Sequence, residues 1–70
     1  MKMKLLDVVA LIQDLPEHGL IQGQVGTVVG ELPPNAYEIE FSDDQGRTYI
    51  SVGVSSDKLI VLHYRPAKAA

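Results

Sequence analysis

The sequence predicts an all-β protein in which five short strands form a small barrel, with one helical turn before the last strand. Segments rich in β-branched and aromatic residues recur at short intervals along the 70 residues. Turn residues, mainly glycine, proline, asparagine and aspartate, separate these segments. Signals for a long amphipathic helix are scarce, and this combination is typical of a small all-β domain.

The first strand is predicted at Asp7–Gln13, because this apolar segment contains two adjacent valines and ends before a loop. We expect the loop, Leu15–Gly19, to be rich in turns, since proline fixes one φ angle and glycine permits the reversed one.

The next stretch, "GLIQGQVGTVVGEL", has four glycines in the fourteen residues 19–32. The valines between them predict a second strand at Gln24–Leu32. Glycine lets a strand bend and lets another backbone approach closely. We therefore expect Gly23 and Gly26 to start this strand at a turn and a kink, and Gly30 to lie where the sheet curves.

Two prolines at 33 and 34 end the second strand, because proline cannot donate to a ladder. The third strand, Tyr37–Ser42, alternates between apolar and polar residues, which predicts one dry face and one wet face. The dry face carries Tyr37, Ile39 and Phe41, and the wet face carries Glu38, Glu40 and Ser42. The sequence Asp43–Gly46 then predicts a hairpin turn with Gly46 at positive φ.

The remaining elements are a fourth strand at Thr48–Val54, one helical turn at Ser55–Lys58 and a fifth strand at Ile60–Tyr64. This order matches SH3-like barrels. We expect a single domain over residues 1–70, with an ordered core of about 5–65 and a loose C-terminal tail. The side chains predicted to face inward are Val9, Leu11, Val28, Ile39, Phe41, Ile50, Val52 and Leu62.

The segments "LLDVVALIQDLPEHGL", "GQVGTVV", "YEIEFSDDQGRTY" and "LIVLHY" resemble the short bacterial proteins grouped as domain of unknown function 4926. The resemblance runs from about Leu5 to Tyr64. It implies stand-alone proteins of similar size, an SH3-like barrel and no established activity. The segment "GQVGTVV" is also similar to the KOW element of ribosomal and transcription proteins, over one strand and a turn.

Motifs for chemistry are weak. The glycine-rich stretch does not fit a phosphate loop, because no lysine lies between Lys4 and Lys58. The two histidines, His18 and His63, lie far apart and lack the spacing of metal ligands. No serine has the flanking residues of a nucleophile elbow. We therefore expect no enzyme, no cofactor and no metal site.

Composition and charge bear on location and partners. The chain has no cysteine, and Asp7 interrupts the apolar run near the N-terminus that would otherwise resemble a signal peptide. No stretch approaches the ~20 apolar residues of a membrane span, so we expect a cytoplasmic protein without a membrane partner. The net charge of −3 disfavours nucleic acid, whose binding needs lysine and arginine.

The leading functional hypothesis is a small non-enzymatic interaction module that binds or restrains a partner protein through an acidic face. Its candidate partner-binding residues are Glu38, Glu40, Asp43 and Asp44. One alternative is a solvated charged face that keeps a strand edge from pairing, with Asp43 and Asp44 as turn formers. Another is a KOW-like protein associated with RNA. Homo-oligomerisation stays open.

Overall fold

The computed structural model describes residues 3–63 and is all-β, as predicted. The strands are β1 (Val8–Leu11), β2 (Val25–Leu32), β3 (Ala36–Ser42), β4 (Thr48–Ser55) and β5 (Leu59–Val61). Two short 3₁₀ turns, η1 (Pro16–His18) and η2 (Ser56–Lys58), lie in the first loop and before the last strand. The helical turn before the last strand is therefore confirmed. The predicted C-terminal tail lies outside the described residues.

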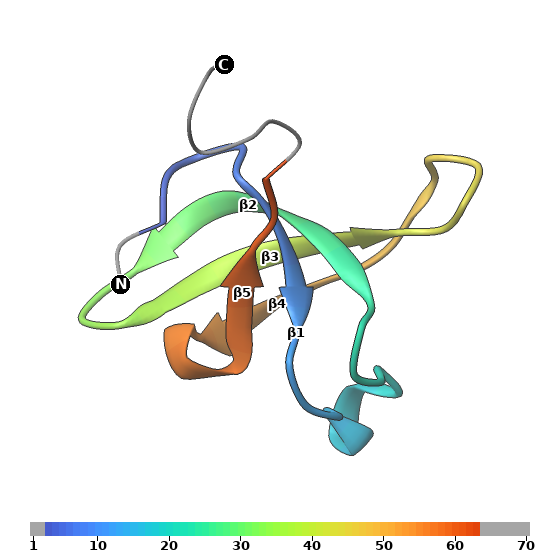
Figure 1. Ribbon diagram of the computed structural model, residues 1–70, viewed down its shortest axis with the longest axis horizontal. Helices are drawn as coiled ribbons and strands as arrows, with labels where there is room; N and C mark the ends of the chain where they lie inside the picture. The colour runs from blue at the N-terminus through green and yellow to red at the C-terminus, as the bar shows by residue number, and fades with distance from the viewer. Residues whose placement is uncertain (1–2, 64–70) are drawn as a thin grey trace, which may run out of the picture.

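The five strands form one antiparallel sheet in the order β4-β3-β2-β1-β5, so β4 and β5 are its two edges. The sheet curls, and the β5–β1 half lies over the β3–β4 half (Figure 1). Within the described part of the chain no ladder joins β4 to β5. The sheet is therefore not closed into a barrel there, and the closure expected from the sequence is not observed.

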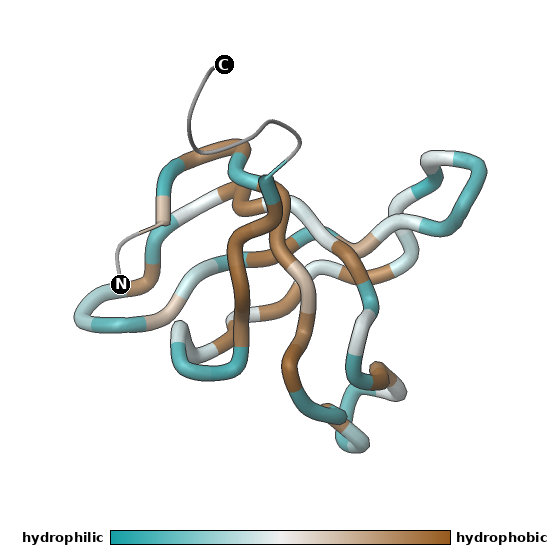
Figure 2. The backbone as a smooth tube through the Cα atoms, viewed as in Figure 1, coloured by the Kyte–Doolittle hydropathy of each residue, from teal (hydrophilic) through white to brown (hydrophobic). Residues whose placement is uncertain are grey.

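The core lies between the two halves of the curled sheet. Hydrophobic segments run along β1, β5 and the middle of β2 and β3 (Figure 2). Five of the eight residues predicted to face inward are buried, and Ile50 and Val52 are half-buried and pack against them. The buried cluster consists of Met3, Val9, Leu11, Leu15, Leu20, Val28, Tyr37, Ile39, Phe41, Val54 and Leu59.

The prediction for the last strand was wrong in position and phase. β5 covers Leu59–Val61 instead of starting at Ile60, and Leu11 pairs with Leu59 directly after η2. Leu59 is therefore buried, Val61 packs against the core, and Leu62 lies outside the cluster. The run "LIVL" is apolar at every position, so its sequence does not indicate which side chains face the core. Tyr64 lies outside the described residues.

Three core residues come from segments that carry no strand pattern. Leu15 and Leu20 flank η1, and their backbones are joined by two hydrogen bonds of 2.8 and 3.2 Å. This folds the first loop back so that both leucines enter the core. Met3 is also buried, and its backbone N–H donates to the Tyr37 hydroxyl over 3.1 Å. A buried tyrosine needs such a partner, and Tyr37 lies in the core as predicted.

The β3–β4 hairpin has the predicted geometry. Gly46 has a φ of +81°, which a residue with a side chain rarely adopts. The Gly46 N–H donates to the Asp43 carbonyl over 3.0 Å, and the Asp43 N–H donates to the Arg47 carbonyl over 2.9 Å. The turn therefore fixes where β3 ends and β4 begins.

Gly26 is the point of closest packing between β2 and β3. A Cβ atom at this position would lie 2.6 Å from Ile39 Cγ2 and 2.9 Å from the Glu40 carbonyl oxygen. The carbonyl belongs to the backbone of a central strand and cannot move aside cheaply. The expected kink at Gly26 is thus a position where only glycine fits. Further along β2, the pairing with β3 shifts register between Val28 and Gly30, which agrees with the expected curvature there.

We expect Phe41→Ala to lower the free energy of unfolding by about 3–5 kcal/mol. Phe41 is fully buried at the centre of the core, so the substitution removes apolar contacts and leaves a cavity. Urea denaturation measures this loss. A change within the range of ordinary surface substitutions, about 0.5 kcal/mol, would show that Phe41 is not central to the core.

We expect Gly26→Ala to destabilise the fold by about 1–3 kcal/mol, because the added methyl group meets backbone. Gly30→Ala is the matched control on the same strand. A Cβ there would contact Glu38 Cβ at 3.5 Å, which is ordinary packing. The control should therefore be neutral or stabilising by less than about 1 kcal/mol. Equal losses in the two variants would disprove the close-approach explanation.

Candidate partner-binding face

Glu38 and Glu40 lie on the central strand β3, with β2 on one side and β4 on the other. Both are half-buried, and they alternate with the buried Tyr37, Ile39 and Phe41. Their side chains therefore share the outer face of the sheet, about 7 Å apart along the strand. The predicted wet face is confirmed. The edge-protecting part of the alternative is wrong, because β3 is not an edge strand. The solvated charged face stays a prediction.

Glycine flanks Glu38 on both neighbouring strands. Its cross-strand partners are Gly30 on β2 and Gly53 on β4. Neither partner has a side chain, and the Leu32 side chain lies over Gly53, where a Cβ would be 2.7 Å from Leu32 Cδ1. The Ser51 hydroxyl donates a hydrogen bond of 2.7 Å to Glu38 Oε2 and holds the side chain over β4.

Glu40 lies in a row of polar residues across the sheet. Its cross-strand partners are Thr27 on β2 and Ser51 on β4. The outer face of β3 thus presents two carboxylates among glycine, serine and threonine. We call Glu38, Glu40 and the following Asp43 and Asp44 the acidic face.

Within residues 3–63, one basic residue pairs with this face, and it does so only at Asp43. All nine acidic residues, but only Lys4, Arg47 and Lys58 of the six basic ones, lie within residues 3–63, which gives this part a formal charge of −6. In the same part of the chain, the one ion pair joins Arg47 to Asp43. The carboxylates of Glu38 and Glu40 therefore have no cationic partner among the described residues.

Asp43 has a structural task inside the hairpin. Its Oδ1 accepts hydrogen bonds from the Gln45 and Arg47 N–H groups over 2.9 and 3.0 Å, and its Oδ2 lies 3.3 Å from Arg47 Nε. The backbone N–H of Arg47 is the main cause that lowers the pKa of Asp43 below its ordinary value of 3.8. This carboxylate is engaged with its own turn, so its main role is to shape the hairpin beside the other acidic residues.

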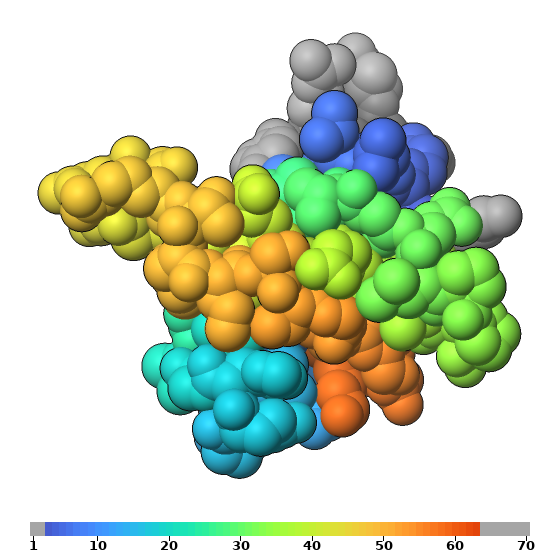
Figure 3. Space-filling view, turned by 180° about the vertical axis from the view of Figure 1, so that it is seen from behind, coloured from blue at the N-terminus to red at the C-terminus, as the bar shows by residue number. Residues whose placement is uncertain are grey.

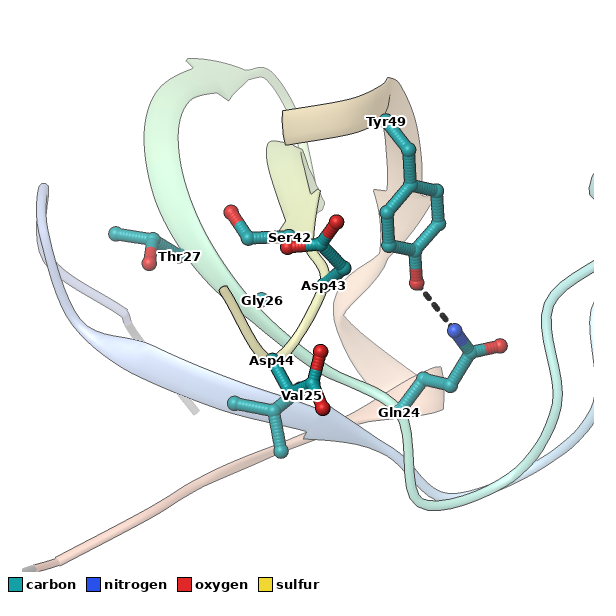
Figure 4. Close-up of a pocket in the computed structure, with 8 residues that line it drawn as sticks. All are labelled: Gln24, Val25, Gly26, Thr27, Ser42, Asp43, Asp44 and Tyr49. Carbon is teal, nitrogen blue, oxygen red and sulfur yellow. Dashed lines mark hydrogen bonds between the residues drawn. The ribbon is translucent and has the colours of Figure 1, made fainter. Parts of the chain in front are cut away.

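Asp44 borders a pocket of about 350 Å³ at the hairpin end of the acidic face. The lining residues come from β2, β3 and β4, from the end of the β1–β2 loop and from the β3–β4 turn, as Figure 4 shows. They are Gln24, Val25, Gly26, Thr27, Ser42, Asp43, Asp44 and Tyr49. Asp44 is exposed, and its carboxylate has no hydrogen bond within the described residues.

A relay of hydrogen bonds fixes one wall of this pocket. The Ile21 N–H donates to Gln24 Oε1 over 2.7 Å, which orients the amide. Gln24 Nε2 then donates to the Tyr49 hydroxyl. The pocket thus combines carboxylate and hydroxyl oxygens, which are acceptors that suit a lysine or arginine side chain.

The sequence pointed to only part of this pocket. Asp43 and Asp44 were predicted and Ser42 was placed on the wet face, while Gln24 and Thr27 carried no signal for a site. These residues meet because the β1–β2 loop ends beside the β3–β4 hairpin, and no local pattern encodes that proximity.

The histidines take no part in this face. His18 ends η1 and His63 follows β5, and both are exposed. Within residues 3–63, no three potential metal ligands gather at one place. The structure also has no helix in this range long and apolar enough to cross a membrane.

We expect the Asp43 carboxyl to titrate below 3.8 in the folded protein, as measured by NMR of its side-chain carbon. A lowered pKa means that the ionised form stabilises the hairpin. This stabilisation is present above the unfolded pKa and is lost as the pH falls through the folded pKa. Asp43→Asn keeps an oxygen acceptor but cannot ionise, so the hairpin of this variant should respond less to acid. An Asp43 midpoint at or above 3.8 would contradict the assignment.

One comparison with known proteins gave a match. A family model described as Domain of unknown function (DUF4926) matches residues 5–61, which is most of the chain. Neither the curated proteins nor the solved structures that were compared gave a match. The family match agrees with the resemblance seen in the sequence, and the chain belongs to the family Domain of unknown function (DUF4926).

Proposed function

We propose that this chain is a small, cytoplasmic, non-enzymatic interaction module with an SH3-like architecture, and that it binds a basic partner protein through its acidic face. The strand order β4-β3-β2-β1-β5, with a 3₁₀ turn before the last strand, supports the architecture. The strand order does not by itself close the sheet into a barrel.

The observation that carries the proposal is the pair of half-buried glutamates on a central strand, which form no ion pair within residues 3–63. Glutamate is disfavoured in strands, and a partly buried charge costs free energy unless it is compensated. A solvated threonine or lysine would serve solubility equally well at these positions. The two carboxylates gain their compensation when a basic partner binds.

The pocket next to Asp44 adds specificity to this surface. A lysine or arginine of the partner enters it, while neighbouring basic residues lie along Glu38 and Glu40. The negative field of the described residues also speeds encounter with a positively charged partner. The same field repels RNA phosphates, so the KOW-like alternative receives no support from the charge distribution.

We expect the double variant Glu38→Gln/Glu40→Gln to keep the fold and to lose the partner. Glu17→Gln/Glu31→Gln is the matched control, because it removes the same charge from two exposed residues outside the acidic face. Immobilised wild-type protein and the control should retain the same basic protein from a lysate of the source cell, and the Glu38/Glu40 variant should not. With the purified partner, the association rate of the Glu38/Glu40 variant should fall about tenfold at low salt and depend less on salt.

The outcomes separate the candidate functions. Equal association rates for wild type and the Glu38/Glu40 variant across a salt series would rule out the acidic face as the docking surface. Retention of RNA on the wild-type protein at moderate salt would favour the KOW-like alternative instead. Circular dichroism of each variant confirms that the comparison is made between folded proteins.

A further inference from the structure

The edge strand β4 is long and uncharged, and no strand within residues 3–63 pairs with its outer edge. Its eight residues, "TYISVGVS", include no proline, lysine or other charged residue. Proteins usually protect a sheet edge with such residues or by keeping the strand short. The opposite edge, β5, is protected in this way, because it is only three residues long. Figure 3 shows the gold-to-orange surface of β4 across this side of the molecule, with the cyan segment of the first loop beside it.

The backbone groups that face the open edge follow from the ladder with β3. The Ser56 N–H donates to the Asn35 carbonyl over 2.9 Å, and the same register pairs Val54 with Tyr37 and Val52 with Ile39. Because hydrogen-bonded pairs recur at every second residue, the even-numbered residues of β4 bond to β3. The N–H and C=O groups of Ser51, Gly53 and Ser55 therefore point away from the sheet. Within residues 3–63, β4 makes no backbone hydrogen bond outside this ladder.

Side chains leave room for a second strand at this edge. Ser51, Gly53 and Ser55 are small, so another backbone can come within hydrogen-bond distance. On the inner face, Ile50 and Val52 are only half-buried at the margin of the core. A strand added beside β4 would pair with the free backbone groups and cover these two side chains.

We propose that the occupant of this edge is β4 of a second copy of the chain, paired antiparallel about a two-fold axis at Val52. In this register Ser51 pairs with Gly53 of the second copy, and Val52 pairs with itself. The same alignment brings Ile50 opposite Val54 of the second copy, so apolar side chains meet on the inner face. No like charges face each other along the paired strands.

Charge fixes the register. The β3–β4 ladder shifts next to Tyr49, so Tyr49 counts as an inserted residue of β4. With the two-fold axis at Val52, Arg47 of each copy lies across from Ser56 and Asp57 of the other copy. This contact occurs twice, once at each end of the paired strands. The Arg47 side chain pairs with Asp43 but is 75% exposed, and Asp57 is exposed, so both side chains can be reached by a second chain. Shifting the axis by one residue to Gly53 would place Arg47 beside the like-charged Lys58.

Two single cysteine variants test the pairing and its register, since the chain has no cysteine of its own. In the proposed dimer the two Val52 residues form a non-hydrogen-bonded pair with Cα atoms about 4.5 Å apart, within the range of a disulfide. The two Ile50 residues would lie four positions out of alignment, about 14 Å apart. Mild oxidation should therefore cross-link Val52→Cys and not Ile50→Cys. Equal cross-linking of the two variants, or none in either, would overturn the proposal.

The oligomeric state of unmodified protein gives an independent measurement. Light scattering with size-exclusion chromatography should give twice the chain mass of 7.6 kDa at high protein concentration. Ser51→Pro removes an N–H that points outward and should yield the monomer, whereas Ser51→Ala loses the same hydroxyl, keeps the N–H and should remain a dimer. A wild-type mass of 7.6 kDa at every concentration would overturn the proposal. Protection of the Ser51 and Gly53 amides that does not change on dilution would then show that the edge is covered within one chain.

Discussion

The fold depends on the close contact of β2 with β3 at Gly26. One sheet has to supply both walls of the core, so β2 must turn from the β3 half toward the β1 half while staying hydrogen-bonded to both. At Gly26 the strand passes so close to Ile39 and the Glu40 backbone that no Cβ fits. This contact orients β3, and β3 in turn places Phe41 inside and the glutamates outside. Core and acidic face are thus two consequences of the same strand geometry.

The sequence predicted those parts of the fold that depend on local residue patterns. The strict alternation of Tyr37–Ser42 predicted which side chains are inside, and the Asp43–Gly46 turn predicted the positive φ of Gly46. The sequence did not predict which residues of the "LIVL" segment face inward, because odd and even positions are both apolar. Burial there depends on which residue pairs with Leu11 after η2. Leu15 and Leu20 were missed for a related reason. A loop brings them into the core, and a loop has no regular alternation of apolar and polar residues that would predict burial.

The candidate site shows the same division. Glu38 and Glu40 were predicted to share a face because residues two apart on a strand must do so. Their place on a central strand, which excludes a role in edge protection, depends on the sheet order and is not visible in the sequence. Asp43 and Asp44 are adjacent and looked equivalent, and both border the pocket, yet only Asp43 accepts the hydrogen bonds of its own turn. That difference arises from the hairpin geometry.

The acidic face and the open edge belong to one surface. In the proposed dimer the two-fold axis is perpendicular to the sheet, so the outer faces of both copies lie on the same side. Each β3 strand is next to its own β4, which separates the two rows of glutamates by three strand spacings, about 14 Å. A partner with two basic segments would bind the second row at a high effective concentration once the first is bound. Edge pairing would therefore turn a weak, exposed acidic surface into a bivalent one without any new contact to the partner.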